Sequence, residues 1–567
     1  MDRRNADARA LQSKHNQQQD QQQETFMSKL KAIAVGLLLQ TALTGTLSAQ
    51  ALNGNPLSDV RVRQAIAYAI DKDTIIATIF DGNAVRADGL LPAGPFKSPN
   101  LDPYSYNPDK ARALLKEANW DPERTLEMVY YYDDQTTADL MTALQAELAD
   151  VGIKMNYHLL TGDVGATLSS IPADPKGKSV VTWDLGYGAR AAMVMQEYFN
   201  DYATGKASSD AYPGSPEMDA LIAASNATAD QDGQIAALMA IDEKINKDLI
   251  SIPFYNIPLQ VVESTRLSRN GEAYGNEQFN YNWGVQNWTI EPDADGKTVM
   301  YTNAGPQDNY FPVPWTDLGF FASNKLTFAH LLFAKGDLGG VAGGDLAETW
   351  TVSPDGLAVT FTLRNGLTWQ DGTAITGDDV TWSIEAALKY PTLHGVLANT
   401  FNSIEGAADY IAGTAEHISG LSVDGATITL KMAKLDPNVL AAFAQFAPLP
   451  KAQFAGVDLT LLGQAPYWQH PIGSGPYVIE DAKFGDYASF TPFEGYWGGK
   501  AKIEQIIAFA SQDGDKNLVK NVLAHRFDFG ITKVTAEVKT LKELDFVRLT
   551  QLDIPYTRMI WVNQYDK

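Results

Sequence analysis

The segment Trp183-Asp-Leu-Gly-Tyr-Gly-Ala-Arg-Ala-Ala-Met-Val-Met195 contains side chains suited to binding a charged small molecule. Arg190 carries a planar guanidinium, whose fork of N–H donors matches a carboxylate or a phosphate. We therefore predict Arg190 as an anion contact, with a structural salt bridge as the alternative. Tyr187 is a candidate aromatic contact, with packing in the core as its alternative. No acidic residue occurs from 185 to 196, so this segment offers no countercharge to an ammonium group.

Residue types for metal, nucleotide or covalent chemistry are missing or poorly spaced. The seven histidines have no short ligand spacing, and there is no cysteine to supply a thiolate. No Walker phosphate loop, no Gly-x-Gly-x-x-Gly and no Gly-x-Ser-x-Gly occurs either. Acidic residues are plentiful, but no motif selects a carboxylate pair for a glycosidase. The sequence therefore predicts no cofactor and no metal site, although distant residues leave a nickel site open.

The composition is that of a soluble globular protein. The 567 residues are 45% hydrophobic and 20% charged, and no run of 18 apolar residues could span a bilayer. This length predicts two to four folding units. The formal net charge of −24 and the lack of a basic patch argue against nucleic acid as a partner.

The N-terminal region predicts export. Residues 1–26 are polar and Gln-rich and are expected to be disordered. Residues 27–51 read as a signal peptide, with a basic start at Met27, a short apolar stretch and small residues before a cleavage site after Ala51. A buried amphipathic helix is the alternative. Because a lipoprotein needs a cysteine to acylate, we expect a soluble protein of the Gram-negative periplasm.

Hydrophobic spacing predicts alternating helices and strands in the first half of the chain. Helices are expected at 60–70, from Pro108 to 118 and at 140–151, and strands at 126–131 and 153–159. The strand, helix and strand in succession imply a crossover in a partly parallel sheet.

The second half reads differently. Val359–Leu363 alternates with polar residues, and Asn365-Gly366 predicts a tight hairpin turn into 367–369. A second hairpin is expected at 423–426. Helices are expected near 379–388 and 514–524. The whole pattern predicts an α/β fold with mixed sheets.

Several motifs then resemble one family. They are Leu346-Ala-Glu-Thr-Trp-Thr-Val-Ser-Pro-Asp-Gly356, Pro471-Ile-Gly-Ser-Gly-Pro-Tyr477, Tyr496-Trp-Gly-Gly-Lys500 and Asp59-Val-Arg-Val-Arg-Gln-Ala-Ile66. Together they resemble the bacterial extracellular solute-binding proteins of family 5, the peptide, nickel and opine binding group. The resemblance implies a bilobed periplasmic-binding-protein fold, with mixed sheets and a ligand cleft between the lobes.

The motifs stand in an unusual order. In the family the Leu-Ala-Glu type motif comes early and the Asp-Val-Arg type motif comes late, whereas here Asp59 precedes Leu346. We therefore expect a circular permutation, which is tolerated where chain ends lie close together on the surface, with a gene-model or assembly error as the alternative. The expected parts are a first lobe at 52–270, a hinge return at 271–290 and a second lobe at 291–567, of which 558–567 crosses toward the first lobe.

The resemblance also implies ligand contacts. Peptide-binding members carry an aspartate about nine residues after the first Asp of this strand, which pairs with the peptide α-amino group. The matching position, counted from Asp184, is Met193, and this departure counts against simple peptides. Further contacts are expected where a strand of the other lobe enters a loop at the cleft. These candidates are Gln307, Asn309, Tyr310 and Trp315, with Trp468 as a further one.

The function implied by the resemblance is that of a periplasmic receptor for an ABC importer. Such a receptor is a monomer and not an enzyme, and it captures a small solute by lobe closure before meeting the permease subunits in the inner membrane. An opine-like or other anionic conjugate and an oligosaccharide rank ahead of a peptide as the ligand. A secreted glycosidase-like enzyme and a non-transport scaffold or chemoreceptor partner are the alternatives.

Overall fold

The structure is a computed structural model, and it describes most of residues 54–566. The residues within this range that it does not describe are 92–93, 170–171, 173, 175–176, 192–193, 207–210, 229, 273–283, 307–308, 317, 319–321, 335–340, 511–516 and 555. The predicted extension at 1–26 and the predicted signal peptide at 27–51 therefore lie outside the described residues.

A six-stranded mixed sheet organises the first half of the chain. Its order is β1 (Val85–Arg86), β5 (Ser251–Asn256), β21 (Tyr556–Val562), β4 (Leu185–Ala191), β2 (Thr125–Tyr130) and β3 (Lys154–Leu159). β2 pairs in parallel with both β3 and β4, and β21 pairs antiparallel with both β4 and β5. The predicted crossover is confirmed, since α5 (Gln135–Asp150) connects β2 to β3.

Helices supply the apolar side chains that pack with this sheet. They are α2 (Val60–Ala69), α3 (Lys72–Thr78), α4 (Pro108–Glu117), α5, α6 (Val164–Ser169), α7 (Pro216–Asn226) and α8 (Gln231–Asp248). The side chains of β21 alternate between two cores. Ile560 and Val562 pack with residues of α2, α4 and α5, whereas Met559 and Trp561 pack with residues of α7 and α8. β21 is therefore a central strand with both faces buried.

A seven-stranded mixed sheet forms a second body of structure. Its order is β16 (Tyr477–Lys483), β17 (Tyr487–Pro492), β18 (Gln505–Ala510), β9 (Val299–Gly305), β19 (Phe529–Thr532), β6 (Leu259–Ser264) and β20 (Val547–Leu552). Two helices, α13 (Leu518–Leu523) and α14 (Thr535–Leu541), accompany its later strands. A short pair, β7 (Leu267–Ser268) with β8 (Thr289–Ile290), follows β6 along the chain.

A four-stranded antiparallel sheet lies between β9 and β16 in sequence. Its order is β12 (Ala347–Val352), β13 (Ala358–Leu363), β15 (Thr427–Lys431) and β14 (Leu421–Asp424). Its helices are α9 (Gly377–Lys389), α10 (Gly395–Phe401), α11 (Ala407–Ile411) and α12 (Val439–Phe443), and a separate pair joins β10 (Leu332–Ala334) to β11 (Val341–Gly344).

One of the two predicted hairpins in this region is confirmed. β14 pairs with β15 across the turn at Gly425, which has a φ of +59°. The other is wrong, because β13 hydrogen-bonds to β12 and β15 rather than to the residues after Asn365-Gly366. Beyond that turn, Thr368 forms only an isolated bridge with Ala374. The turn is local, whereas long-range pairing selects the partners of β13.

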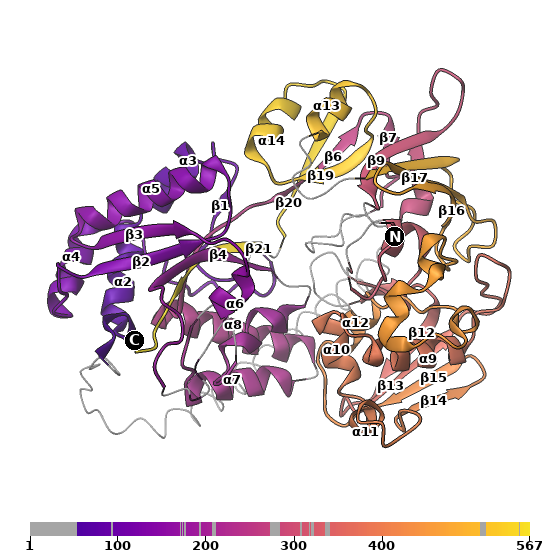
Figure 1. Cartoon of the computed structure of the whole chain (residues 1–567), viewed down its shortest axis with the longest axis horizontal. Helices are drawn as coiled ribbons and strands as arrows, with labels where there is room; N and C mark the ends of the chain where they lie inside the picture. Colours follow the sequence, from indigo (N-terminus) through magenta and orange to yellow (C-terminus); the bar gives the residue numbers. More distant parts are fainter. Residues whose placement is uncertain are drawn as a thin grey trace, which may run out of the picture. The chain divides into compact units, whose positions relative to one another are not determined.

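The chain passes between the six-stranded and the seven-stranded sheets at two places. β5 and β6 are separated by Ile257 and Pro258, and β20 and β21 are separated by residues 553–555. We predicted the crossing at 271–290, but β6 already pairs with β19 and β20 of the seven-stranded sheet. Pro258 accounts for the earlier position, because proline lacks the N–H that a continuous strand would donate. Figure 1 shows β21, in yellow, between the purple strands of the first half.

The start of the described chain meets its end. Asn55 is buried, and its Nδ2 donates hydrogen bonds to the carbonyl oxygens of Asn563 (2.9 Å) and Tyr565 (2.7 Å). Its Oδ1 accepts from the backbone N–H of Leu57, which begins the short helix Pro56–Ser58. One side chain thus ties the residues before α2 to those after β21.

Candidate functional site

One edge of the six-stranded sheet gathers the ends of several strands. β2, β4 and β5 all run antiparallel to β21, directly or through the ladder, so their carboxyl ends lie beside the amino end of β21. Both chain crossings leave from this edge, which we call the crossing edge. In open α/β sheets, ligands bind outside the carboxyl ends of the strands.

Tyrosines from four segments converge at the crossing edge. Tyr132 follows β2, Tyr187 lies on β4, Tyr255 lies on β5 and Tyr556 begins β21. The hydroxyls of Tyr132 and Tyr556 share a hydrogen bond of 3.1 Å, and those of Tyr187 and Tyr255 share another. The rings of Tyr132 and Tyr187 meet edge to face, with their centroids 6.1 Å apart. The crossing edge therefore holds a compact group of tyrosines, of which Tyr187 and Tyr255 are buried.

Arg558 lies among these tyrosines. On β21 it faces Ala189 of β4 and Tyr255 of β5 in the register of the sheet. Its guanidinium carbon is 3.6 Å from the ring centroid of Tyr132 and 5.2 Å from that of Tyr556, both within the range of a cation–π contact. We call Arg558 and the four tyrosines the Arg558 cluster.

The guanidinium of Arg558 lacks hydrogen-bond partners within the part of the chain that is described. Its side chain is half-buried, but Nε and Nη1 are shielded from solvent and neither donates to any described residue. None of the acidic groups described lies within ion-pair distance of it. Because most buried polar groups in folded proteins are paired, this guanidinium is an exception that needs a physical explanation.

The hydroxyls of Tyr132, Tyr187 and Tyr255 keep their protons at physiological pH. Burial raises the pKa of Tyr187 to about 12, and burial also raises the pKa of Tyr132 and of Tyr255. Arginine keeps its proton in proteins, so Arg558 carries the positive charge of the cluster. The cluster therefore combines one fixed cation with neutral hydroxyls that can donate hydrogen bonds, which is a chemistry suited to an anion.

Arg190 is engaged elsewhere. Its Nη1 donates to Asp201 Oδ2 at 3.0 Å and to the carbonyl oxygen of Tyr198 at 3.3 Å, and its guanidinium lies over the ring of Tyr202 at 5.0 Å. These contacts fit the structural salt bridge that the sequence left as the alternative. Its role as an anion contact stays a prediction that its geometry does not favour.

Two of the predicted aromatic contacts are core residues. Trp315 is fully buried, donates from Nε1 to the carbonyl oxygen of Ala447 at 2.8 Å and stacks on Phe446. Trp468 is also fully buried and donates from Nε1 to the carbonyl oxygen of Leu462 at 2.8 Å. The packing and the hydrogen bonds of both indoles are those of core residues.

The other predicted contacts are scattered. Tyr187 belongs to the Arg558 cluster, although it is buried there. Asn309 and Tyr310 are exposed, with 47% of the Tyr310 surface accessible. Met193 and Gln307 lie outside the described residues. The ligand contacts at Asn309, Tyr310, Met193 and Gln307 stay predictions.

Arg558 was missed because its cluster is assembled from distant segments. The sequence did carry one signal, since Arg558 interrupts the apolar run of a strand that the motif order placed against the first lobe. A charged residue inside a central strand is rare unless it is paired or functional. That signal marks the position but not its neighbours.

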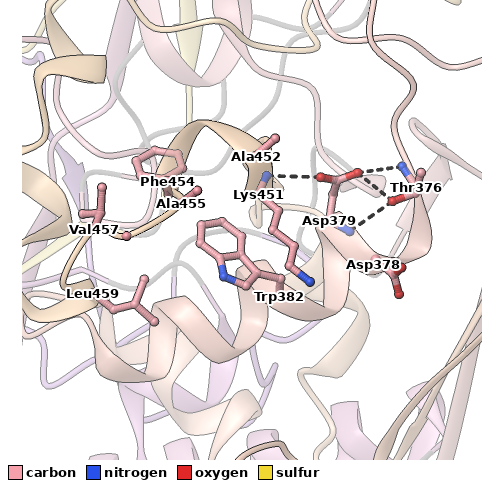
Figure 2. Close-up of a pocket in the computed structure, with 11 residues that line it drawn as sticks. Thr376, Asp378, Asp379, Trp382, Lys451, Ala452, Phe454, Ala455, Val457 and Leu459 are labelled. Atoms are coloured by element: carbon pink, nitrogen blue, oxygen red, sulfur yellow. Dashed lines mark hydrogen bonds between the residues drawn. The ribbon is translucent and has the colours of Figure 1, made fainter.

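A pocket of about 590 Å³ lies at the start of α9, beside residues 451–459 (Figure 2). There the Asp379 carboxylate accepts from the backbone N–H groups of Thr376 and Lys451, at 2.9 and 3.1 Å. Trp382 stacks on Phe454 with a centroid distance of 5.6 Å. Asp379 is thus engaged in the capping box of α9 with Thr376.

Within residues 54–566 and their gaps as given above, no group of three or more His, Asp or Glu side chains could hold a metal ion. Over the same residues, no helix combines the length and apolar character needed to cross a membrane.

The comparisons with known proteins agree on a family. The chain matches the family described as bacterial extracellular solute-binding proteins, family 5 Middle, over residues 4–217 and 342–566. It is 26% identical over 242 residues to the dipeptide-binding protein of Escherichia coli (strain K12), covering 41% of this chain and 44% of that protein. It is 38% identical over 125 residues to the glutathione-binding protein GsiB of Pectobacterium atrosepticum, covering 22% of this chain and 23% of that protein.

A solved structure adds a weaker likeness. The lactococcal OppA complexed with an endogenous peptide is 22% identical, with a TM-score of 0.37 over 44% of this chain and 48% of that one. The chain thus spans less than half the length of each protein compared. The two family matches nevertheless cover well over half of this chain and confirm the resemblance read from its motifs. The chain belongs to family 5 of the bacterial extracellular solute-binding proteins.

Proposed function

We propose that the chain is the solute-binding receptor of an ABC importer, exported to the periplasm as a soluble monomer. The family is one of extracellular solute-binding proteins, and relatives matched over part of their length are named as peptide-, dipeptide- and glutathione-binding proteins of such systems. On this proposal the protein binds its solute without covalent chemistry, and its partners are the permease subunits of the importer.

The observation that carries the proposal is the position of the Arg558 cluster at the crossing edge. The two segments that connect the six-stranded and seven-stranded sheets both leave from this edge. A solute bound there would contact residues next to both segments, and its contacts could favour one arrangement of the two lobes over another. A ligand shifts such an equilibrium by its difference in affinity for the two states.

The ligand class follows in part from charge. No acidic residue occurs from 185 to 196, which removes one countercharge for a peptide ammonium. The charge of the cluster itself is that of Arg558. We therefore rank anionic conjugates, including opine-like compounds, first and oligosaccharides second, with unmodified peptides third.

Native mass spectrometry of the purified protein tests the proposal. We expect a small solute to co-purify with the protein. Adding this solute to ligand-free protein should change the tryptophan fluorescence, because Trp561 stacks on Tyr131, which adjoins Tyr132 of the Arg558 cluster. Small-angle scattering should show a smaller radius of gyration with the solute than without it. Protein prepared by unfolding and refolding, which strips the solute, is the control.

Two results would contradict this function. One is a protein whose scattering and fluorescence stay unchanged with a metabolite extract of the source cells. The other is turnover of the bound solute, for example glycoside hydrolysis that depends on a specific carboxylate, which would revive the enzyme alternative.

A further inference from the structure

We propose that Arg558 binds a carboxylate group of the transported solute, with the surrounding tyrosine hydroxyls as additional donors. The inference rests on the proposed receptor function and adds the chemical group by which the solute is recognised. It also gives the solute an orientation, with its anionic end at β21.

The first step is the contrast between Arg558 and the other buried arginines. Arg63 donates from Nη1 to the carbonyl oxygen of Leu57 and from Nε to that of Asp248, at 2.7 and 3.0 Å. Arg190 is paired with Asp201, and Arg269 lies 3.6 Å from the carboxylate of Glu263. In Arg558, by contrast, Nε and Nη1 have no partner among the described residues. The fold therefore places a carboxylate or carbonyl oxygens beside Arg63, Arg190 and Arg269, and it places neither beside Nε and Nη1 of Arg558.

The second step concerns the energy of an unpaired buried charge. Removing a cation from water is costly unless an anion and hydrogen bonds replace the lost solvation. A bound carboxylate would supply both. Such a group is expected to persist at a binding site, where stability is exchanged for function, and not in a core that packing alone could fill.

The third step separates a carboxylate from a phosphate. Phosphate-binding sites in proteins typically use several cationic side chains or the backbone N–H groups at the start of a helix. The Arg558 cluster contains one cation and tyrosine hydroxyls. A planar monoanion fits the single guanidinium and its flanking rings better.

The first test needs no ligand. We compare the thermal unfolding of ligand-free wild type with that of Arg558→Met, which keeps the length of the side chain and removes its charge. Arg190→Met is the matched control, because it removes a paired guanidinium from the same sheet. We expect Arg558→Met to unfold at or above the wild-type temperature and Arg190→Met to unfold below it. A loss in Arg558→Met as large as in Arg190→Met would show a structural role and overturn the inference.

The second test measures stabilisation by acids and their uncharged analogues. The probes are N-acetyl-Ala-Ala, its carboxamide, benzoate, benzamide and maltotriose. We expect at least one acid to stabilise wild type while its amide does not, and we expect Arg558→Met to lose that stabilisation, with an affinity at least about 30-fold lower. Arg190→Met should keep the preference for the acid.

The outcomes separate this inference from the receptor function. If an amide or maltotriose binds wild type and Arg558→Met equally well, the carboxylate site is wrong and the receptor function stands. If wild type binds no probe and no solute co-purifies with it, both are wrong.

Discussion

The side chain of Asn55 lies 2.7 Å from the carbonyl oxygen of Tyr565, although the two residues are 510 positions apart in the chain. This contact holds the residues that precede α2 against those that follow β21. The circular permutation read from the order of the motifs stays a prediction. Both crossing segments, between β5 and β6 and between β20 and β21, are continuous along the chain.

Replacing Asn55 with alanine should loosen the end of β21. The substitution removes two donors to buried carbonyl groups, so we expect the free energy of unfolding to fall by about 2 kcal/mol. Hydrogen exchange of the backbone amides of residues 560–565 should become faster. Asn402, which is exposed at the end of α10, provides the control, since Asn402→Ala should change neither quantity. Unchanged exchange in Asn55→Ala would show that the ends are held by other contacts.

Gly188 should tolerate no side chain. A Cβ at this position of β4 would lie 2.0 Å from Cη2 of Trp561, whereas a Cβ at Gly186 would lie 3.0 Å from Cε3 of the same ring. We expect Gly188→Ala to lower the free energy of unfolding by about 1–3 kcal/mol and Gly186→Ala to lower it by less, because overpacking forces the indole to move. Urea unfolding followed by tryptophan fluorescence measures both. Equal losses in the two variants would contradict the steric account.

The pair formed by Arg190 and Asp201 should stabilise the fold without selecting the solute. We expect Arg190→Gln to lower the free energy of unfolding by about 1–3 kcal/mol, because the Asp201 partner remains half-exposed. In a double-mutant cycle with Asp201→Asn, the second substitution should add little to the first. Solute affinity should stay within about twofold of wild type. A large loss of affinity in Arg190→Gln with Asp201→Asn unaffected would restore Arg190 as a ligand contact.

Two buried carboxyl groups should make the protein more stable in mild acid. Burial raises the pKa of Asp242 and of Asp345 to about 6. Since both values lie above the unfolded value near 3.9, the folded state binds more protons between about pH 4 and 6. The resulting stabilisation is present at low pH and is lost as the pH rises through 6. We expect the free energy of unfolding to fall by about 1–2 kcal/mol per group between pH 5 and 7.

Asp242→Asn tests this pH dependence. The amide oxygen can still accept from the backbone N–H of Leu90, which Asp242 Oδ1 now does at 2.9 Å. The variant should therefore show a flatter dependence of stability on pH than wild type from pH 5 to 7. The exposed Asp295→Asn is the control and should keep the wild-type slope. An Asp242→Asn slope equal to that of wild type would place the titration elsewhere.

Local patterns predicted much of the fold. The crossover from β2 through α5 to β3 follows from clear periodicity, and α9 begins at Gly377 behind the capping Thr376. The hairpin after Val359–Leu363 was wrong because the partners of β13 come from β12 and from β15, about 70 residues later. A turn signal in the sequence fixes a bend but cannot choose a distant partner.

The candidate site was harder to predict than the fold. Arg190 has the right chemistry for an anion, but the sequence cannot show that Asp201, eleven residues later, already neutralises it. Arg558 becomes a candidate only after β21 is placed between β4 and β5, where tyrosines from distant segments surround it. The sequence thus indicated that an arginine binds the anion. Only the tertiary structure shows that Arg190 has an acidic partner and that Arg558 has none among the described residues.

A crystal structure of the protein with its co-purified solute tests the central claim most directly. We predict that a carboxylate of the solute lies within hydrogen-bond distance of Arg558 and of at least one tyrosine hydroxyl of the Arg558 cluster. A solute bound at the pocket beside Trp382, or one that presents no anionic group to Arg558, would contradict the account.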